Sequence, residues 1–389
     1  MSHSLLARPG SPVASVLPAA AISSRAWDAL VEPAGFYSSP EWVLGLESAH
    51  GPHSALAATS AGRLIGLVPT WKNAAPTGLF SLPAMTAPLR GDWTREVLWL
   101  GTARGTANTV TCTRDPHLRG PTLKALVDLA LEQAVAQGRT GVVWPYLSGP
   151  AAREVAACHP LAQAVLHGAD PVMTVPRGGM AELEARAGGK QRRAWRRERR
   201  LFRASCSSLE WTSLSPEVCE LIGPLLAGTR DKYGGSGGTA WMQRVLAGQI
   251  TSGVAHQAVV ALARTNSDVS AAAVFYRHRG WLYGRYWGAT SAAPQYAYFA
   301  LTVYEALDFA ARHRFGRLHL SVPASHAKVA RGAQLSPLAL VFIPTGNRPE
   351  IDPAVLRRHN HRIATQWLTS GGSGICTEAD SSWSAWMLK

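Results

Sequence analysis

The feature that most constrains the fold of this chain is a local pattern that occurs once in each half. Apolar residues recur at helical spacing over 121–137, a glycine follows, and 141–147 has the composition of a buried strand. The same helical spacing returns over 303–311, again followed by a glycine and then by the strand-like stretch 317–322. Two strands precede each helix. This repetition predicts two related α/β (α+β) domains in tandem, each a mixed sheet flanked by helices.

The composition is that of a globular chain with a charged partner. Of the 389 residues, 47% are hydrophobic and 16% are charged, which excludes a mainly disordered or collagen-like chain. The 39 Lys and Arg residues outnumber the 25 Asp and Glu residues, so the formal net charge is +14. This balance favours a polyanionic partner, which could be nucleic acid, anionic lipid or a phosphate-rich substrate or cofactor.

Neither the cysteines nor the apolar segments indicate a secreted or membrane-spanning chain. The number of cysteines, five, is odd, and no two of them are two or three residues apart, so we expect neither a disulfide framework nor a metal site. No apolar run reaches the roughly 18 residues of a membrane span. Prolines interrupt the Ala- and Ser-rich start, which we interpret as a tail and not as a signal peptide. The expected location is cytoplasmic.

These patterns divide the chain into five parts, of which glycines and prolines mark the borders. The expected parts are a flexible N-terminal tail over 1–21, a first domain over 22–175, a linker with an arginine-rich helix over 176–203, a second domain over 204–345, and a C-terminal extension over 346–389 with one short helix near 353–368.

The most unusual segment is 190–203, which holds eight basic residues and one acid. As a helix it aligns its arginines in two neighbouring rows and leaves a narrow apolar seam for docking. Arginine suits bidentate contacts with phosphate, and such contacts would offset the repulsion among the guanidinium groups. A solvated helix face and a site for a single pyrophosphate are the alternatives, and sparse aromatic residues argue against base-specific readout. The candidate tRNA- or phosphate-binding residues are Lys190, Arg192, Arg193, Arg196, Arg197, Arg199, Arg200 and Arg203.

A glycine-rich stretch over 230–238 has four glycines in five positions. Glycine lets a backbone approach a ligand closely, and exposed N–H groups can hold an anion. No Lys-Ser or Lys-Thr pair follows, so the stretch is not a P-loop. Asp231 and Tyr233 are its candidate side chains, while a flexible loop between two helices explains the residue types equally well.

The stretch 270–289 indicates two strands joined by a turn, with aromatic residues around an arginine on the second strand. An arginine in such a setting suits a cleft wall that binds a polar, partly planar ligand, and an edge strand with stacked side chains is the alternative. Strand alternation predicts Trp281, Tyr283, Arg285 and Trp287 on one face, and Leu282, Gly284 and Tyr286 on the other.

The last candidate segment, 321–332, directly follows a strand, and ligands in open α/β sheets collect at the carboxyl ends of strands. Lys328 and Arg331 would share one helical face there. A lone histidine such as His326 is more often structural than catalytic.

Together these segments resemble a known family. The motifs that carry the resemblance, in order, are 36–42, the arginine-rich helix, Lys232-Tyr-Gly, Leu282-Tyr-Gly-Arg-Tyr-Trp-Gly288 and His326-Ala-Lys-Val-Ala-Arg-Gly332. Over roughly 25–345 the chain is similar to the FemABX-like group of the GNAT acyltransferase superfamily. The resemblance implies tandem GNAT-like domains and transfer of an aminoacyl group from aminoacyl-tRNA to an amine. Other members imply acyl-CoA donors, but 63–68 and 285–290 each miss the last position of the GNAT pyrophosphate loop.

An acyl transfer to an amine requires a neutral nucleophile, a stabilised oxyanion and a proton for the leaving group. By position and by resemblance we expect Lys328 to stabilise the oxyanion, Tyr283 or Tyr286 to donate the proton, and Asp231 to act as base. No Ser-His-Asp or Cys-His arrangement is evident, so we expect direct transfer, with no cofactor beyond the donor. The expected substrate-binding residues are Arg285, Trp287, Tyr233, His326, Arg331 and Glu305, the last of which is more simply explained as a charge on a helix surface.

The leading hypothesis is therefore an aminoacyl-tRNA-dependent transferase that forms an amide with a cell-wall precursor or a small natural product. An acyl-CoA-dependent N- or O-acyltransferase is the first alternative. A non-catalytic nucleic-acid-binding protein on a GNAT scaffold is the second.

Overall fold

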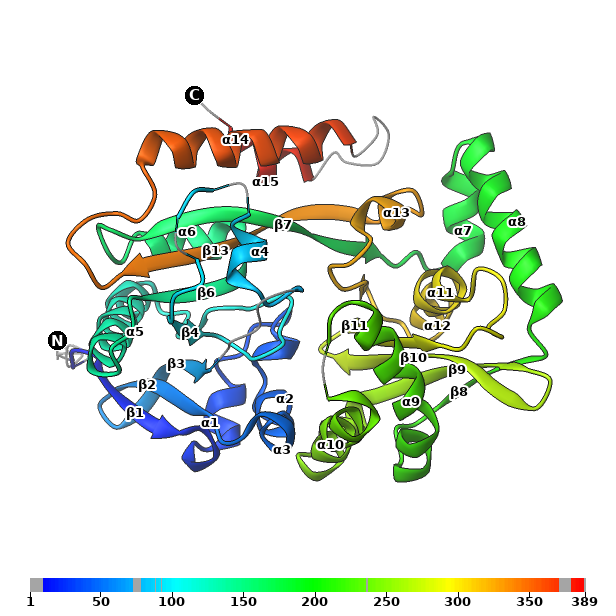
Figure 1. Cartoon of the computed structure of the whole chain (residues 1–389), viewed down its shortest axis with the longest axis horizontal. Coiled ribbons are helices and arrows are strands. Elements are labelled where there is room, and N and C mark those ends of the chain that lie inside the picture. The colour runs from blue at the N-terminus through cyan, green and yellow to red at the C-terminus, as the bar shows by residue number, and fades with distance from the viewer. Residues whose placement is uncertain are drawn as a thin grey trace, which may run out of the picture.

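One mixed β-sheet of thirteen strands runs through the part of the chain that the structure describes (Figure 1). The structure is a computed structural model, and it describes residues 10–72, 78–87, 89–91, 93–235, 237–370 and 379–387. The strand order is β1-β2-β3-β4-β6-β13-β7-β12-β11-β10-β9-β8, with β5 paired to β3. The strands are β1 Val13–Pro18, β2 Ser54–Ser60, β3 Arg63–Trp71, β4 Leu98–Leu100, β5 Thr111–Cys112, β6 Gly141–Ser148, β7 Gln163–Thr174, β8 Ser208–Thr212, β9 Ala258–Thr265, β10 Asp268–His278, β11 Trp281–Ala289, β12 Arg317–His319 and β13 Gln334–Pro344.

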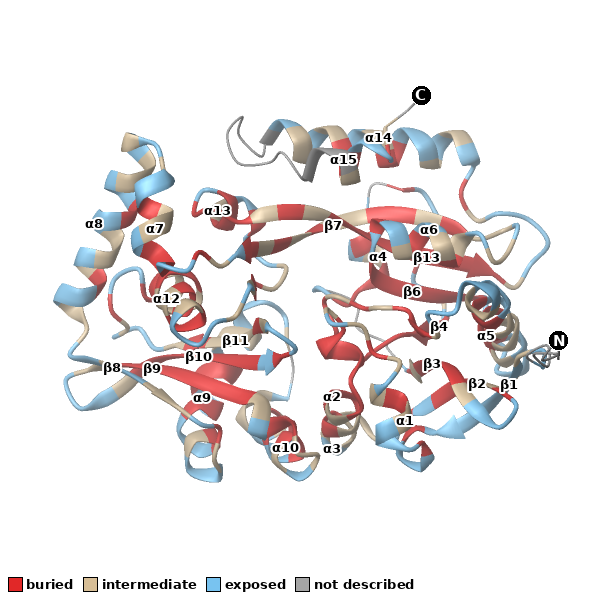
Figure 2. Cartoon of the chain, turned by 180° about the vertical axis from the view of Figure 1, so that it is seen from behind, coloured by how far each residue is buried: buried red, intermediate tan, exposed pale blue. Residues whose placement is uncertain are grey.

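The helices cover both faces of this sheet (Figures 1 and 2). Several begin at a Ser or Asp cap followed by proline, a combination that satisfies a free N–H group and fixes the first helical φ. Asp115 with Pro116 and Ser215 with Pro216 are two such starts. The helices are α1 Ser24–Asp28, α2 Pro40–Gly45, α3 Glu47–His50, α4 Leu82–Met85, α5 Pro116–Ala136, α6 Gly149–Ala156, α7 Gly179–Arg186, α8 Gly189–Ser205, α9 Pro216–Lys232, α10 Gly238–Thr251, α11 Ala297–Phe299, α12 Glu305–Arg312, α13 Ser325–Val329, α14 Pro353–Ser370 and α15 Ala379–Ser384.

The two halves are joined at the middle of the sheet by exchanged strands. Strand β13 comes from the second half, yet it lies between β6 and β7 and pairs antiparallel with both. Strand β7 is long enough to belong to both halves, because it pairs with β13 over 163–172 and with β12 over 172–174. The predicted domain bounds stay a prediction, and the last strand of the second half completes the sheet of the first.

The apolar side chains form a core layer on each side of the sheet. One cluster is shared by both halves, since it contains Tyr37 and Tyr146 of the first half with Tyr276 and Tyr283 of the second. The opposite face carries separate clusters, one under α5, α6, α14 and α15 and one under α8, α11 and α12. The shared cluster therefore fixes how the halves meet.

The expected elements over 121–137, 141–147 and 353–368 are confirmed as α5, β6 and α14. The prediction of a flexible tail over 1–21 is wrong for residues 13–18. Residues 13–18 form edge strand β1, which pairs antiparallel with β2 along six residue pairs. Proline is tolerated there because an edge strand has one unpaired side. Residues 1–9 lie outside the described part of the chain.

Candidate active site

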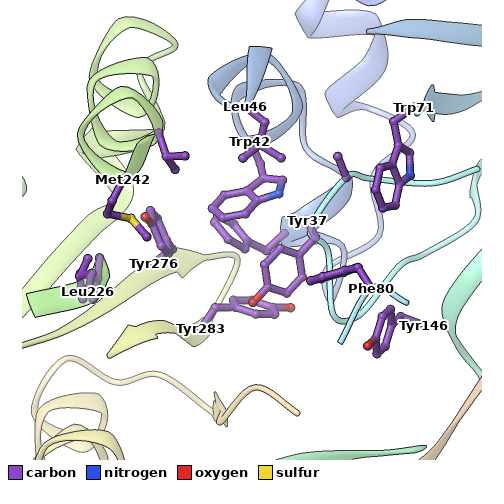
Figure 3. Packing of buried hydrophobic residues seen from close by; sticks show 14 of the residues in the cluster. Tyr37, Trp42, Leu46, Trp71, Phe80, Tyr146, Leu226, Met242, Tyr276 and Tyr283 are labelled. Atoms are coloured by element: carbon purple, nitrogen blue, oxygen red, sulfur yellow. The ribbon is translucent and has the colours of Figure 1, made fainter. Parts of the chain in front are cut away.

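A wall of buried aromatic rings forms where the first half meets the second (Figure 3). The turn 36–38 leads into α2, and the Ser39 side chain caps that helix. The turn presses Phe36 against the second half, with its ring 4.9 Å from Tyr276 and 5.1 Å from Tyr283. Stacked rings add to the apolar burial and hold the strand ends of both halves in fixed positions.

Beside this wall lies a cavity of about 140 Å³ at the ends of β6, β7, β11, β12 and β13. It is bordered by both halves of the chain. In a protein with net charge +14, this cavity carries carboxylates and neutral polar groups and none of the arginines or lysines. The lining side chains that can accept or donate a proton are Glu32, Tyr146, Asp170, Tyr283 and His319. Glu32 lies 3.7 Å from Arg119, which partly offsets its charge, so the cavity is electronegative mainly at Asp170, and that end suits a cationic or amine ligand.

Asp170 and His319 meet across neighbouring strands at the cavity. Asp170 Oδ1 lies 2.8 Å from His319 Nε2, and His319 is 1% exposed. The Ser321 N–H donates to Nδ1 of this ring at 3.3 Å, which places the ring proton on Nε2, facing Asp170. The Asp170–His319 angles are not those of a hydrogen bond, so Oδ1 is a buried acceptor without a well-aligned donor among the described residues. An N–H group of a ligand would satisfy it.

Tyr283 brings a hydroxyl to the same cavity. Its ring is buried and lies 5.1 Å from the His319 ring. The backbone of Phe36 is close, but the hydroxyl forms no hydrogen bond of ordinary geometry with the described residues. Burial, and then the negative charge of Asp170, raise the pKa of this phenol well above its usual value. Tyr283 therefore stays protonated and can donate a proton.

Unusual backbone conformations surround the cavity. Tyr146 lies on β6 at φ 57°, and Ser321 and Ala324 in the loop after β12 have φ of 62° and 61°. Left-handed φ values cost energy for residues other than glycine, and they persist where the surrounding contacts impose them. Tyr146 lines the cavity, and the loop with Ser321 and Ala324 directly follows the lining residue His319.

Lys328 is hydrogen-bonded to the loop that follows β12. Its ammonium is fully buried and donates to the Leu320 carbonyl at 2.6 Å and to the Ser321 carbonyl at 2.9 Å. It is not among the residues that line the cavity. The geometry therefore gives Lys328 a positioning role for the strand end that carries His319. The predicted role in oxyanion stabilisation stays a prediction without support from this arrangement.

Burial lowers the pKa of Lys328 to about 7, and the charge of Asp170 opposes this shift. The unfolded chain, with a lysine pKa of about 10.4, binds more protons than the folded chain between pH 7 and 10. Stability should therefore rise with pH across that window, and the full cost of the buried charge should be present below pH 7. We expect the free energy of unfolding of the wild type, relative to Lys328→Met, to increase from pH 6 to pH 9 in urea titrations. Lys124→Met, which removes an exposed lysine of α5, is the control variant.

A β-bulge corrects the predicted faces of β11. Val274 pairs with Tyr286 and Phe275 with Gly284, so Arg285 is an extra residue without a partner. The extra residue reverses the alternation beyond it. Tyr286 consequently packs against the same cluster as Tyr283, whereas Trp287 packs on the opposite face against Tyr298. The predicted common face of Tyr283 and Trp287 is wrong for this reason.

The other predicted site residues are dispersed. Asp231 is exposed at the end of α9, and Tyr233 beyond it is 79% exposed. Tyr286 accepts a hydrogen bond from Gln249 Nε2 at 3.2 Å. His326 is exposed and stacks on Trp367 of the C-terminal extension, with ring centroids 4.6 Å apart. None of these four side chains lines the cavity.

Helix α8 has two different charged faces. On the inner face, Arg196 and Arg199 both contact Glu184 of α7 at 2.8 Å, and Arg203 lies 3.7 Å from Glu305. Arg331 after α13 forms a bidentate pair with Glu198 of the helix, in which Nη2 donates to Oε1 at 2.7 Å and Nε donates to Oε2 at 3.1 Å. We define the outer face as the exposed side chains that have no ion pair within the described residues: Lys190, Arg193, Arg197 and Arg200.

The inner-face contacts dock α8 and leave its outer face in solvent (Figure 2). Trp195 contributes by donating to the Ala330 carbonyl at 3.0 Å. Three of the eight predicted phosphate-binding residues, Arg196, Arg199 and Arg203, thus pair with acids of the chain itself. The half-buried Arg192 forms no ion pair in the described residues.

Neither a membrane-spanning helix nor a metal site is found in the described residues. No helix among them is both long and apolar enough to cross a bilayer. No group of three or more His, Cys, Asp or Glu side chains among them is arranged to hold a metal ion.

Comparison with known proteins shows which family and which solved structures this chain is similar to. Residues 182–341 match the FemAB-like family, which is described as peptidoglycan biosynthesis/recognition. FemX is 10% identical with a TM-score of 0.56, and the match covers 85% of this chain and 98% of FemX. A conserved protein of unknown function from Bacteroides thetaiotaomicron is 14% identical with a TM-score of 0.53, covering 83% of this chain and 98% of that one.

The C-terminal domain of a putative lysylphosphatidylglycerol synthetase from Agrobacterium fabrum is 11% identical with a TM-score of 0.52, covering 91% and 98% of the two chains. No curated protein matches this chain in sequence. At these identities the solved structures establish the fold. The shared fold confirms the predicted α/β class, and the match over 182–341 confirms the predicted resemblance to the FemABX-like group over that part of the chain.

Proposed function

We propose that this chain, of FemABX-like fold, is an acyltransferase that forms an amide bond by moving an aminoacyl group from aminoacyl-tRNA to an amine. The match of 182–341 to the FemAB-like family and the shared fold with FemX support acyl transfer. The family description favours an acceptor from cell-wall synthesis, with a small natural product as the other class of acceptor. Such a reaction would take place in the cytoplasm, where charged tRNA is available.

The electronegative cavity is the proposed site of the acceptor amine. A carboxylate beside it, Asp170, can accept a proton from the ammonium or from the attacking nitrogen. The nitrogen attacks the ester carbonyl, the C–N bond forms, and the bond from that carbon to the 3′-terminal ribose oxygen breaks. The released oxygen takes a proton from Tyr283, which is one of the residues that line the same cavity. Where Asp170 takes the ammonium proton, it passes that proton to water before the attacking nitrogen gives up its second one. The second proton returns from Asp170 to the Tyr283 phenolate, directly or through water, so that protons balance over one turnover.

The observation that carries the choice of donor is the outer face of α8. Its four cations stand at helical spacing on one side of the helix, exposed and without acidic partners in the described residues. Like charges so close together repel one another, and a polyanion that contacts them relieves the repulsion and releases counterions. Their number and spacing along an exposed helix suit the phosphate backbone of RNA better than a single pyrophosphate.

The test is a binding titration with bulk aminoacylated tRNA at several salt concentrations, followed by the variant in which Arg193, Arg197 and Arg200 are replaced by Ala. We expect this variant to bind tRNA about 10- to 100-fold more weakly at moderate salt. Its log–log salt dependence should be shallower by about 0.7–0.9 for each phosphate that an arginine no longer neutralises. A matched variant removes three exposed arginines elsewhere, Arg63, Arg114 and Arg357, and should bind almost as the wild type does.

The same titration with coenzyme A decides between the donors. Retention of coenzyme A with only weak tRNA binding that α8 does not affect would contradict the aminoacyl-tRNA donor and favour acyl-CoA. Tight tRNA binding without any transfer to amine acceptors would leave the chain as a nucleic-acid-binding protein.

A further inference from the structure

A second group of charged side chains lies where the halves meet, outside the acceptor cavity. Arg285 is the extra residue of the β11 bulge, and its Nη2 donates to the Arg104 carbonyl of the first half at 2.7 Å. The Arg285 guanidinium lies 5.6 Å from the ring of Tyr37 and 5.6 Å from that of Trp42. Arg104 lies over Phe80 at 5.2 Å. Two cations from distant parts of the chain are thus held together against aromatic rings.

Neither of these two arginines has an acidic partner among the described residues. Arg104 and Arg285 form no ion pair there, and the Nε atom of each is buried without a hydrogen-bond partner in that part of the chain. Other half-buried arginines of the chain are neutralised, as Arg119 is by Glu154 at 2.5 Å and Arg331 by Glu198. Partly desolvated cations without a counter-charge cost free energy, which an added anion would offset.

Burial and the positive charges of these arginines lower the pKa values of basic side chains nearby. Burial, followed by the charges of Arg230 and Arg285, lowers the pKa of Arg104 to about 10. Burial, followed by Arg104, His53, Arg230 and Arg285, lowers the pKa of His50 to about 4. His50 and Arg230 both contact the ring of Trp241, at 5.5 and 3.8 Å. Arg230 therefore adds its charge from α9 to the same region.

We propose that Arg104 and Arg285, with the added charge of Arg230, bind a phosphate group where the two halves meet. Guanidinium groups offer planar pairs of N–H donors that match phosphate oxygens, and the buried Nε–H groups of Arg104 and Arg285 lack a partner that a phosphate oxygen would supply. The site adjoins the acceptor cavity, because the Tyr37 ring that Arg285 approaches also lies 6.0 Å from the His319 ring. The inference does not depend on the identity of the acyl donor.

The left-handed backbone of Arg104 makes a clean variant possible. Its φ is 60°, a conformation that asparagine tolerates well, and its contact with Arg285 uses the backbone carbonyl. Arg104→Asn therefore removes one charge and retains both the turn and the inter-half hydrogen bond. Arg314 is an exposed arginine with the same φ of 60°, so Arg314→Asn is a matched control for charge and for backbone.

The experiment is calorimetric titration of the whole chain with inorganic pyrophosphate at low salt, in the wild type and after removal of the α8 outer-face arginines. We expect one binding event that survives removal of those arginines, weakens roughly tenfold or more in Arg104→Asn, and is unchanged in Arg314→Asn. Arg104→Lys should retain part of the affinity. Equal binding by Arg104→Asn and wild type, or complete loss with the α8 variant, would overturn the proposal.

Competition then identifies the source of the phosphate. Displacement of pyrophosphate by uncharged tRNA or by coenzyme A would assign the site to the donor. Displacement by a nucleoside diphosphate, with no effect of tRNA or coenzyme A, would assign it to a nucleotide-linked acceptor. A site that none of these ligands can occupy, and that holds pyrophosphate only at millimolar concentration, would contradict a functional phosphate site.

Discussion

Aminoacyl transfer by Asp170→Asn should fall by about 10²- to 10⁴-fold, the usual contribution of a positioned general base. Asparagine has the same shape and keeps a carbonyl oxygen near His319, so the cavity should remain intact. It cannot take a proton from the acceptor amine. Single-turnover transfer from a charged tRNA to an amine acceptor measures the effect. Affinity for tRNA should stay at the wild-type value because no residue of α8 lines the cavity that contains Asp170.

Asp231→Asn is the matched control for this prediction. The sequence predicts Asp231 as the base, but this residue is exposed and does not line the cavity. This variant should transfer at nearly the wild-type rate. A large loss in Asp231→Asn with full activity in Asp170→Asn would reverse the assignment. Full activity in both variants would mean that the amine arrives neutral and needs no protein base.

Gly288→Ala should destabilise the fold by about 3 kcal/mol or more, near the upper end of what overpacking costs. A Cβ atom at this position of β11 would lie 2.3 Å from the Leu225 carbonyl carbon and 2.4 Å from its oxygen. Those are backbone atoms of α9, so no side-chain rotation can relieve the clash. The helix would have to move off the sheet, and the shared core with it. The denaturation midpoint in urea, followed by tryptophan fluorescence, measures the loss.

The control is another strand glycine, Gly168 of β7, where an added Cβ would meet nothing within 4 Å. Gly168→Ala should be as stable as the wild type or slightly more so, because alanine loses less backbone entropy on folding. Equal midpoints for Gly288→Ala and wild type would show that α9 is not fixed against β11.

The helices and strands could be predicted where their periodicity was strong and local. The apolar spacing over 121–137 and the strand over 141–147 gave α5 and β6 to within a few residues. The exchange of β13 into the first half could not be predicted, since strand order depends on contacts between residues some 200 positions apart. The bulge at Arg285 could not be predicted either, because the alternation of side chains in a sequence does not reveal a single unpaired residue.

The candidate site shows the same limit. Asp170 stands in a strand of mixed composition and His319 in another, 149 positions later, and only the antiparallel pairing of β7 with β12 brings them together. A signal did exist, since an acid and a histidine inside strands are unusual. The arginine-rich helix was recognisable from composition. Its division into a paired inner face and a free outer face required the positions of Glu184, Asp308 and Glu305.

The place of β13 also bears on how the protein is made. During translation, β6 and β7 are synthesised long before residues 334–344. Until β13 is made, the sheet of the first half lacks the strand that lies between β6 and β7. Until then the facing edges of β6 and β7 offer unpaired N–H and C=O groups to any extended segment nearby. The first half therefore cannot reach its native sheet during its own synthesis, and its completion is coupled to that of the second half.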